Sequence, residues 1–81
     1  MNRSDILDVI QIKISKIKES ALVVHENDYI DFRGTGLNSI ELMTLLVYLE
    51  EYFDFESDDE DLNLEKIILV SDLIDLVKRF V

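Results

Sequence analysis

The spacing of the apolar residues constrains the fold of this chain more than any other feature. Leucine, isoleucine and valine recur three and four residues apart in three separate segments, which places them on one face of a helix in each. Proline is absent, so no strong helix breaker interrupts these segments. With 81 residues, 48% of them apolar, and no cysteine, the chain can bury one small core without a disulfide. The sequence predicts an all-α fold with a single domain over residues 1–81.

The first predicted helix runs from Ser4 to about Ser20. Ser4 is the expected N-cap, and Lys16 and Lys18 lie near the end of the helix, where its dipole favours cations. The expected apolar face consists of Ile6, Leu7, Ile10, Ile14 and Ile17.

The second predicted helix begins after Asn38 and runs to about Asp54. Asn38 and Glu41 form a capping-box pattern, in which the asparagine caps the helix and the glutamate reaches back to the cap. The expected core face consists of Leu42, Leu46, Leu49 and Phe53, with Met43 and Leu45 beside it.

Two further helical segments are predicted in the last third of the chain. Ser57-Asp58-Asp59-Glu60 is a second capping-box pattern, which indicates a short helix or turn within residues 58–67. Ser71 is the expected N-cap of the last helix, and Lys78 and Arg79 complete it. Its inward-facing residues are expected to be Leu73, Ile74, Val77 and either Phe80 or Val81. Together the segments predict a small four-helix bundle with three long helices and one short helix.

Residues 21–37 fit no regular element. A connection of this length is unusual in a compact domain and indicates a functional loop. Tyr29, Ile30 and Phe32 are expected to pin it to the core, and Gly34-Thr35-Gly36 closes it.

The charge of the chain is concentrated in the acidic segment, defined here as residues 34–65. This segment has ten acidic residues and no basic residue, and the whole chain has a formal net charge of −10. Nucleic-acid binding is disfavoured, because affinity for phosphates depends on lysine and arginine. A basic protein partner would be attracted to this segment, mainly through faster encounter. The alternative is an acidic surface that only keeps the chain soluble.

Catalysis by the polypeptide itself is not predicted. His25 is the only histidine, and no serine, cysteine or metal partner for it is evident in the sequence. The acids at 58–61 do not match a calcium loop, because Asn63 and Leu69 stand where glycine and glutamate are required. Gly34 and Gly36 lack the lysine and spacing of a nucleotide-binding loop. The chain shows no signal peptide or membrane span, and we expect a cytoplasmic monomer without a metal site.

Ser39 is the residue best placed to carry a modification. It opens a well-capped helix directly after the glycine-containing loop. A phosphate ester on its hydroxyl would meet free backbone N–H groups and the positive end of the helix dipole. Spacing alone favours the simpler interpretation that Ser39 is an ordinary residue of the helix start.

The sequence around Ser39 resembles the carrier-protein family, which comprises acyl carrier proteins and peptidyl carrier proteins. The family's G-x-D-S-L motif reads Gly36-Leu37-Asn38-Ser39-Ile40 here. The following helix, residues 41–53, ends in acidic residues and an aromatic, as in the family. Residues 58–62 are similar to the acidic stretch after that helix, and residues 70–74 to the start of the final helix. The resemblance extends from about Asp31 to Val81.

The resemblance implies a carrier with a 4'-phosphopantetheine arm on Ser39, attached from coenzyme A by a phosphopantetheinyl transferase. Such an arm holds acyl or aminoacyl intermediates as thioesters for fatty acid, polyketide or nonribosomal peptide biosynthesis, and supplies the thiol that this cysteine-free chain lacks. The partners would be loading, condensing and transferase enzymes with basic docking patches. The residues that the resemblance assigns to partner binding are Leu37, Asn38, Ile40, Glu41, Met43, Glu50 and Glu51.

Four departures from the family pattern favour a discrete carrier in a specialised pathway. Asn38 replaces the usual aspartate, and Thr44 replaces a glutamate often found in mid-helix. Val47 and Tyr48 make the helix more apolar than in many fatty acid carriers, and the proline that often begins the acidic stretch is absent. The alternative function is an unmodified acidic helical adaptor with the same fold, which acts only through protein contacts. The two hypotheses differ in whether Ser39 accepts phosphopantetheine.

Overall fold

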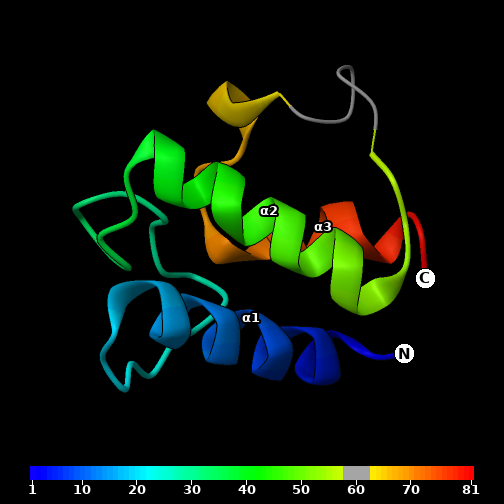
Figure 1. Cartoon of the computed structure of the whole chain (residues 1–81), viewed down its shortest axis with the longest axis horizontal. Helices are drawn as coiled ribbons and strands as arrows, with labels where there is room; N and C mark the ends of the chain where they lie inside the picture. Colours follow the sequence, from blue (N-terminus) through cyan, green and yellow to red (C-terminus); the bar gives the residue numbers. More distant parts are fainter. Residues whose placement is uncertain (58–62) are drawn as a thin grey trace.

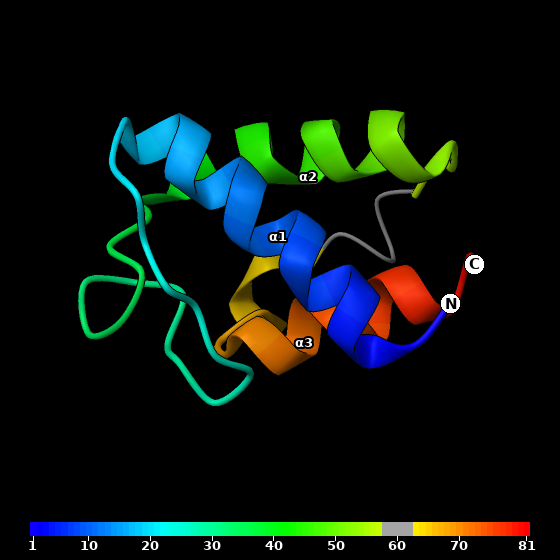
Figure 2. The same ribbon diagram turned by 90° about the horizontal axis from the view of Figure 1, so that it is seen from below.

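The fold is all-helical, as predicted, in a computed structural model that describes residues 1–57 and 63–81. Three α-helices, α1 (Arg3–Lys18), α2 (Ser39–Phe53) and α3 (Val70–Lys78), are accompanied by one short 3₁₀ helix, η1 (Leu64–Lys66). The described residues form no strand. Figure 1 shows α1 and α2 running in opposite directions, and α1 packs against both α2 and α3. In Figures 1 and 2 the two termini lie together, at the end of the molecule opposite the long loop between α1 and α2.

Helix α1 starts earlier and ends sooner than the sequence predicts. Asn2, rather than Ser4, is the N-cap, because its Oδ1 accepts a hydrogen bond from the Asp5 N–H at 2.9 Å. The helix ends at Lys18, since Glu19 adopts a left-handed conformation with φ of 52°. Ile6, Ile10 and Ile14 are fully buried, and Leu7 and Ile17 pack against the core from its edge.

Helix α2 has the predicted bounds, and its buried face differs from the predicted one at Leu45 and Phe53. The buried residues are Leu42, Leu45, Leu46 and Leu49. Leu45 therefore belongs to the core itself, while Met43 is 57% exposed and Phe53 is only partly buried. In the described part of the chain, the buried side chains are all hydrophobic.

Helix α3 begins at Val70, so the prediction of Ser71 as its N-cap is wrong. The Asp72 carboxylate instead accepts hydrogen bonds from the N–H groups of Ile68 and Leu69, at 2.9 and 2.8 Å. The predicted inward residues Leu73, Ile74 and Val77 are buried, together with Val70 and Leu76. Phe80 stacks on Phe55 at the rim, with ring centroids 4.7 Å apart, and Val81 is 47% exposed.

The loop before α2 is held to the start of α3 mainly by backbone hydrogen bonds. The Val70 and Ser71 N–H groups donate to the carbonyls of Asp28 and Glu26, both at 2.9 Å, and the Ile30 N–H donates to Ile68 O at 2.9 Å. Ile30 is buried, as predicted.

Two of the three predicted anchors of this loop need correction. Phe32 is 88% exposed and Tyr29 is 38% exposed, so neither pins the loop by burial. Tyr29 takes part instead in an isolated antiparallel bridge with Leu69, and the Arg33 guanidinium lies over its ring.

The predicted short helix within residues 58–67 is confirmed as η1. Asn63 caps it by accepting a hydrogen bond from the Glu65 N–H at 3.1 Å. Most of the capping-box pattern at Ser57–Glu60 lies outside the described residues. Among those described, no helix is long and apolar enough to cross a membrane.

Candidate functional site

Ser39 is the first residue of α2, and its side chain is exposed. Its hydroxyl makes no hydrogen bond to any other described residue. The N–H groups of Ser39 and Ile40 likewise have no acceptor among the described residues, as is usual for the first turn of a helix. The site therefore combines a free hydroxyl with two free donors at the positive end of α2.

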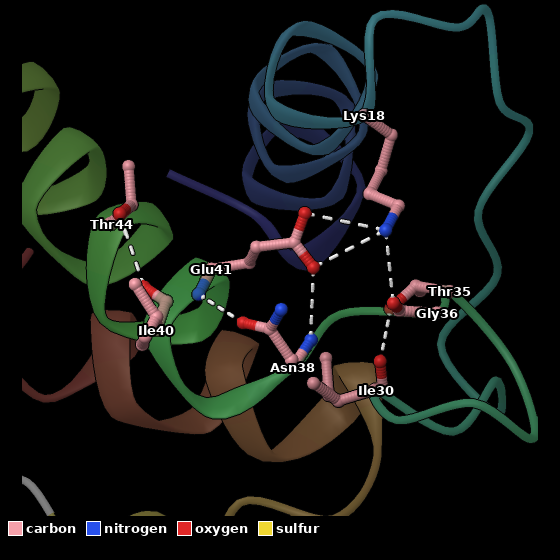
Figure 3. Close-up of polar contacts among 8 residues, drawn as sticks. All are labelled: Lys18, Ile30, Thr35, Gly36, Asn38, Ile40, Glu41 and Thr44. Atoms are coloured by element: carbon pink, nitrogen blue, oxygen red, sulfur yellow. Dashed lines mark hydrogen bonds and ion pairs between the residues drawn. The ribbon is translucent and has the colours of Figure 1, made fainter.

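The predicted capping box around Ser39 is confirmed. The Asn38 Oδ1 accepts from the Glu41 N–H at 2.8 Å, and the Glu41 Oε1 accepts from the Asn38 N–H at 3.1 Å (Figure 3). Asn38 satisfies this geometry without the negative charge of an aspartate. Asn38, directly before Ser39, and Glu41, two residues after it, thus hold the helix start in place by reciprocal hydrogen bonds.

Lys18 is a residue of this site that the sequence analysis did not identify. Its Nζ donates to the Gly36 carbonyl at 3.1 Å and lies 3.2 and 3.3 Å from the two carboxylate oxygens of Glu41 (Figure 3). The Asn38 N–H and then the Lys18 ammonium lower the pKa of Glu41 below its ordinary value. Lys18 is 23 residues from Glu41 in sequence, so no local spacing signals the pair.

The loop that leads to Ser39 is folded tightly on its own backbone. A Cβ at Gly34 would lie 2.0 Å from the Tyr29 carbonyl oxygen, so no other residue fits there without a backbone shift. Gly36 has φ of +82°, which glycine adopts at little cost. The Thr35 N–H donates to Tyr29 O at 2.8 Å, and its hydroxyl donates to Ile30 O. These contacts fix the backbone that presents Ser39.

A surface hollow of about 240 Å³ lies beside Ser39, between this loop, the first turn of α2 and the η1 region. Its apolar lining consists of Ile30, Leu37, Leu42, Leu64, Ile67 and Ile68. Asp31, Arg33, Asn38 and Glu65 contribute its polar lining. The Arg33 guanidinium pairs with Asp31 at 2.8 Å and lies 3.9 Å from the Tyr29 ring centroid, and it lowers the pKa of Asp31.

The residues predicted to contact partners fall into two groups in the structure. Ile40 and Met43 are 77% and 57% exposed, and Val47, which the sequence analysis did not assign to partner binding, continues their stripe at 49% exposure. Leu37 is 4% exposed and packs in the core while also lining the hollow beside Ser39, so its predicted contact with a partner stays a prediction. Asn38 and Glu41 are engaged in the capping box described above.

Glu50 and Glu51 lie at the other end of α2. Glu51 is exposed, and Glu50 accepts a hydrogen bond from the Ser57 N–H at 3.2 Å. Within residues 1–57 and 63–81, neither of them forms an ion pair. Thr44, in the middle of the helix, donates its hydroxyl to the Ile40 carbonyl at 3.1 Å (Figure 3).

Among residues 1–57 and 63–81, the remaining histidine and acidic side chains do not gather into a second site. The His25 side chain is 74% exposed and its Nδ1 lies 3.6 Å from the Asp28 carboxylate. No group of three or more histidine or acidic residues suited to a metal ion occurs in the described ranges.

Comparison with known proteins finds a relative that matches over nearly its whole length. The chain is 31% identical over 77 residues to an acyl carrier protein of Desulforapulum autotrophicum, and the match covers 86% of this chain and 95% of that protein. No protein-family model matches the chain. No solved structure matches it either.

Proposed function

The chain belongs to the acyl carrier protein family, and on that premise we propose that it carries acyl groups on a 4'-phosphopantetheine arm attached to the Ser39 hydroxyl. Proteins of this family are carriers and not catalysts, so the chemistry of the cargo belongs to partner enzymes. The observation that carries the proposal is the state of Ser39: an exposed hydroxyl without a hydrogen-bond partner among the described residues, at the first turn of a capped helix.

The surroundings of Ser39 suit a phosphodiester. The free N–H groups of Ser39 and Ile40 can donate to its oxygens, and the α2 dipole favours negative charge at this end. Asn38 adds no negative charge beside it, and the charge of Glu41 is balanced by Lys18. The hollow of about 240 Å³ next to Ser39 leaves room for part of the arm or its cargo.

Attachment of the arm is a phosphoryl transfer from coenzyme A. The Ser39 Oγ attacks the phosphorus that bears the pantetheine, so an Oγ–P bond forms and the P–O bond within the pyrophosphate breaks. Adenosine 3',5'-bisphosphate leaves with the bonding electrons, and the hydroxyl proton passes to a base of the transferase. Ser39 must therefore be accessible and held still, which the capping box and the glycine loop both favour.

The arm supplies the thiol that forms the thioester with the cargo, since the chain has no cysteine of its own. The polypeptide contributes a tether that raises the effective concentration of the cargo at a docked enzyme. The cargo class and the pathway, whether fatty acid, polyketide or nonribosomal peptide synthesis, follow from the partners. Asn38 and Thr44 support a specialised pathway.

The partner surface we propose is the outward face of α2. Its apolar part is the exposed stripe of Ile40, Met43 and Val47, which begins next to Ser39. Its charged part is Glu50 and Glu51, which have no ion-pair partner among the described residues. A loading, condensing or transferase enzyme with a basic patch beside an apolar contact fits this surface.

The test is the intact mass of the purified protein before and after incubation with coenzyme A, magnesium and a broad-specificity phosphopantetheinyl transferase. We expect the wild type to gain one phosphopantetheine and Ser39→Ala to gain none. Ser20→Ala, which removes an exposed serine at the end of α1, is the matched control and should load fully. Failure of the wild type to load with several transferases would instead favour the unmodified adaptor.

A further inference from the structure

Lys18 joins α1 to the site of modification. The acidic segment, residues 34–65, has no basic residue of its own. In the part of the chain that the structure describes, the pair of Lys18 and Glu41 is the one ion pair made by an acid of this segment. The lysine is the last residue of α1, and Figure 3 shows its side chain extending to the start of α2.

The contacts of Lys18 bracket Ser39 in the sequence. Its Nζ donates to the carbonyl of Gly36, three residues before Ser39, at 3.1 Å. It also lies 3.2 Å from the carboxylate of Glu41, two residues after Ser39. The stem of Lys18 runs beside Gly36, because a Cβ built there would have the Lys18 Cε as its nearest neighbour, at 3.9 Å. One side chain therefore holds both backbone segments that flank the serine.

The same ammonium changes the electrostatics at Ser39. An unbalanced carboxylate at Glu41 would repel the phosphate of coenzyme A and the phosphodiester that follows. Lys18 lies against both Glu41 oxygens, so the acid closest in sequence to Ser39 does not act as an isolated charge. The ammonium of Lys18 also supplies positive charge to the acidic segment, which has no basic residue of its own.

We propose that Lys18 is a positioning residue for the modification of Ser39, which it serves by fixing Gly36 and Glu41 on either side of the serine and by balancing the charge of Glu41. This inference rests on the proposed function, since it concerns the transfer of phosphopantetheine to the Ser39 hydroxyl. Lys18 acts on Ser39 only through Gly36 and Glu41, and makes no contact of its own with the hydroxyl.

If Lys18 only stabilised the fold, its loss would lower the free energy of unfolding. The side chains of Lys18 and Glu41 are 30% and 25% exposed, and ion pairs that are open to water contribute little to the free energy of unfolding. The loss of Lys18 should therefore leave the fold nearly as stable as before, while the rate of modification falls. A variant with an unchanged melting temperature and slower loading separates positioning from folding.

The experiment measures kcat and KM for phosphopantetheine transfer to the full-length apo protein, with intact mass as the readout. Lys18→Met removes the charge and the donors but keeps a long apolar stem. Lys18→Arg keeps the charge and the donors. Lys16→Met is the matched control, because Lys16 lies in the same last turn of α1 with its Nζ over the Tyr48 ring, 5.2 Å from the centroid.

We expect Lys18→Met to lower kcat about fivefold, with KM changed less than about twofold, because the docked serine is held less well. Lys18→Arg should recover most of the rate, and Lys16→Met should stay within about twofold of the wild type in both constants. Wild-type kinetics in Lys18→Met would overturn the inference. An equal loss in Lys16→Met would also overturn it, since the effect would then be one of net charge.

A second measurement distinguishes this inference from the proposed function. Amide hydrogen exchange at residues 36–41 of the apo protein should accelerate in Lys18→Met while exchange in the middle of α1 stays unchanged. If the wild type loads and this exchange is unaltered, the positioning role is wrong and the carrier function stands. If the wild type never loads, the proposed function is wrong, and the role of Lys18 in modification is overturned with it.

Discussion

The two ends of α2 are built differently. At the Ser39 end, residues 36–42, the acid Glu41 is tied to Asn38 and Lys18, and the preceding loop is closed by backbone hydrogen bonds. At the Asp54 end, residues 50–57, the acidic side chains form no ion pair within the described residues, and the last turn of the helix has no basic residue. Both ends carry acids, but only one end balances them.

The helix dipole acts in opposite ways on the acids at the two ends of α2. A carboxylate near a helix N-terminus is stabilised by the dipole, and one near the C-terminus is destabilised by it. Glu41 therefore contributes to the local structure, whereas Glu50, Glu51 and Asp54 stand where they repel one another and the helix end. Acids that cost stability in the isolated chain are the ones we expect an external basic partner to use.

The largest expected effect concerns the rigid loop at the Ser39 end. Gly34→Ala places a Cβ against the Tyr29 carbonyl, so the loop backbone must move, and we expect a loss of about 2–3 kcal/mol in the free energy of unfolding. Gly36→Ala, whose Cβ would make only an ordinary contact with the Lys18 stem but whose φ stays positive, should cost about 1 kcal/mol. Denaturant unfolding of both variants measures this, and equal losses would contradict the close approach at Gly34.

The second prediction concerns the charges at the Asp54 end. Replacing both Glu50 and Glu51 by lysine should lower kcat/KM for a basic transferase about tenfold at low salt, because encounter is slowed. The loss should shrink as salt screens the interaction. Glu41→Gln should change kcat/KM less than about twofold, since this acid is already paired with Lys18. A larger loss from Glu41→Gln that shrinks as salt is added would show that the balanced acid is the one that partners read.

The third prediction concerns the cap itself. Asn38→Ala removes the acceptor for the Glu41 N–H and should cost about 1 kcal/mol in thermal or denaturant unfolding. Asn38→Asp keeps the acceptor and adds a charge that the dipole favours, so it should be as stable as the wild type or slightly more stable. A loss in Asn38→Asp as large as that in Asn38→Ala would contradict this prediction, because the added charge would then cost as much stability as the lost cap.

The smallest expected effect is a pH dependence. The pKa of Glu41 is lowered in the fold from its ordinary value of 4.5, by the Asn38 N–H first and Lys18 second. A lowered pKa means that the carboxylate stabilises the fold above that ordinary value, and that this contribution is lost as the pH falls through the folded pKa. We expect the wild type to be more stable than Glu41→Gln near about pH 6, with the difference vanishing in acid.

Glu51→Gln is the matched control at the other end of the helix. Removing an unpaired acid near the negative end of the dipole should raise stability slightly near about pH 6, which is the opposite sign. Measuring the free energy of unfolding of both variants across the acid range checks the comparison. The same sign for both variants would mean that the two ends do not differ.

The parts of the fold that depend on neighbours in sequence were predictable. The three long helices could be predicted because the apolar residues in each segment repeat with one helical period. Asn38 and Glu41 predicted a capping box, and the two hydrogen bonds between these residues confirm it. Ser39 could be placed at the helix start for the same reason. Its modification is still a prediction, supported by the family and by its exposed hydroxyl.

The parts that depend on distant contacts were not predictable. Helix α3 begins at Val70 because the Asp28 and Glu26 carbonyls accept its first N–H groups, and no pattern around Ser71 contains that information. Lys18 reaches Glu41 across the space between two helices. The burial of Leu37 likewise depends on how the whole core packs, which no local pattern around this residue contains.

The position of the added mass on the chain shows whether Ser39 is the site of modification. Fragmentation of the loaded protein in the mass spectrometer assigns the phosphopantetheine to one of the six serines in the sequence. We predict that all of the added mass resides on Ser39. Attachment at another serine, or no attachment by any transferase, would contradict the claim that the Ser39 end of α2 is a site of modification.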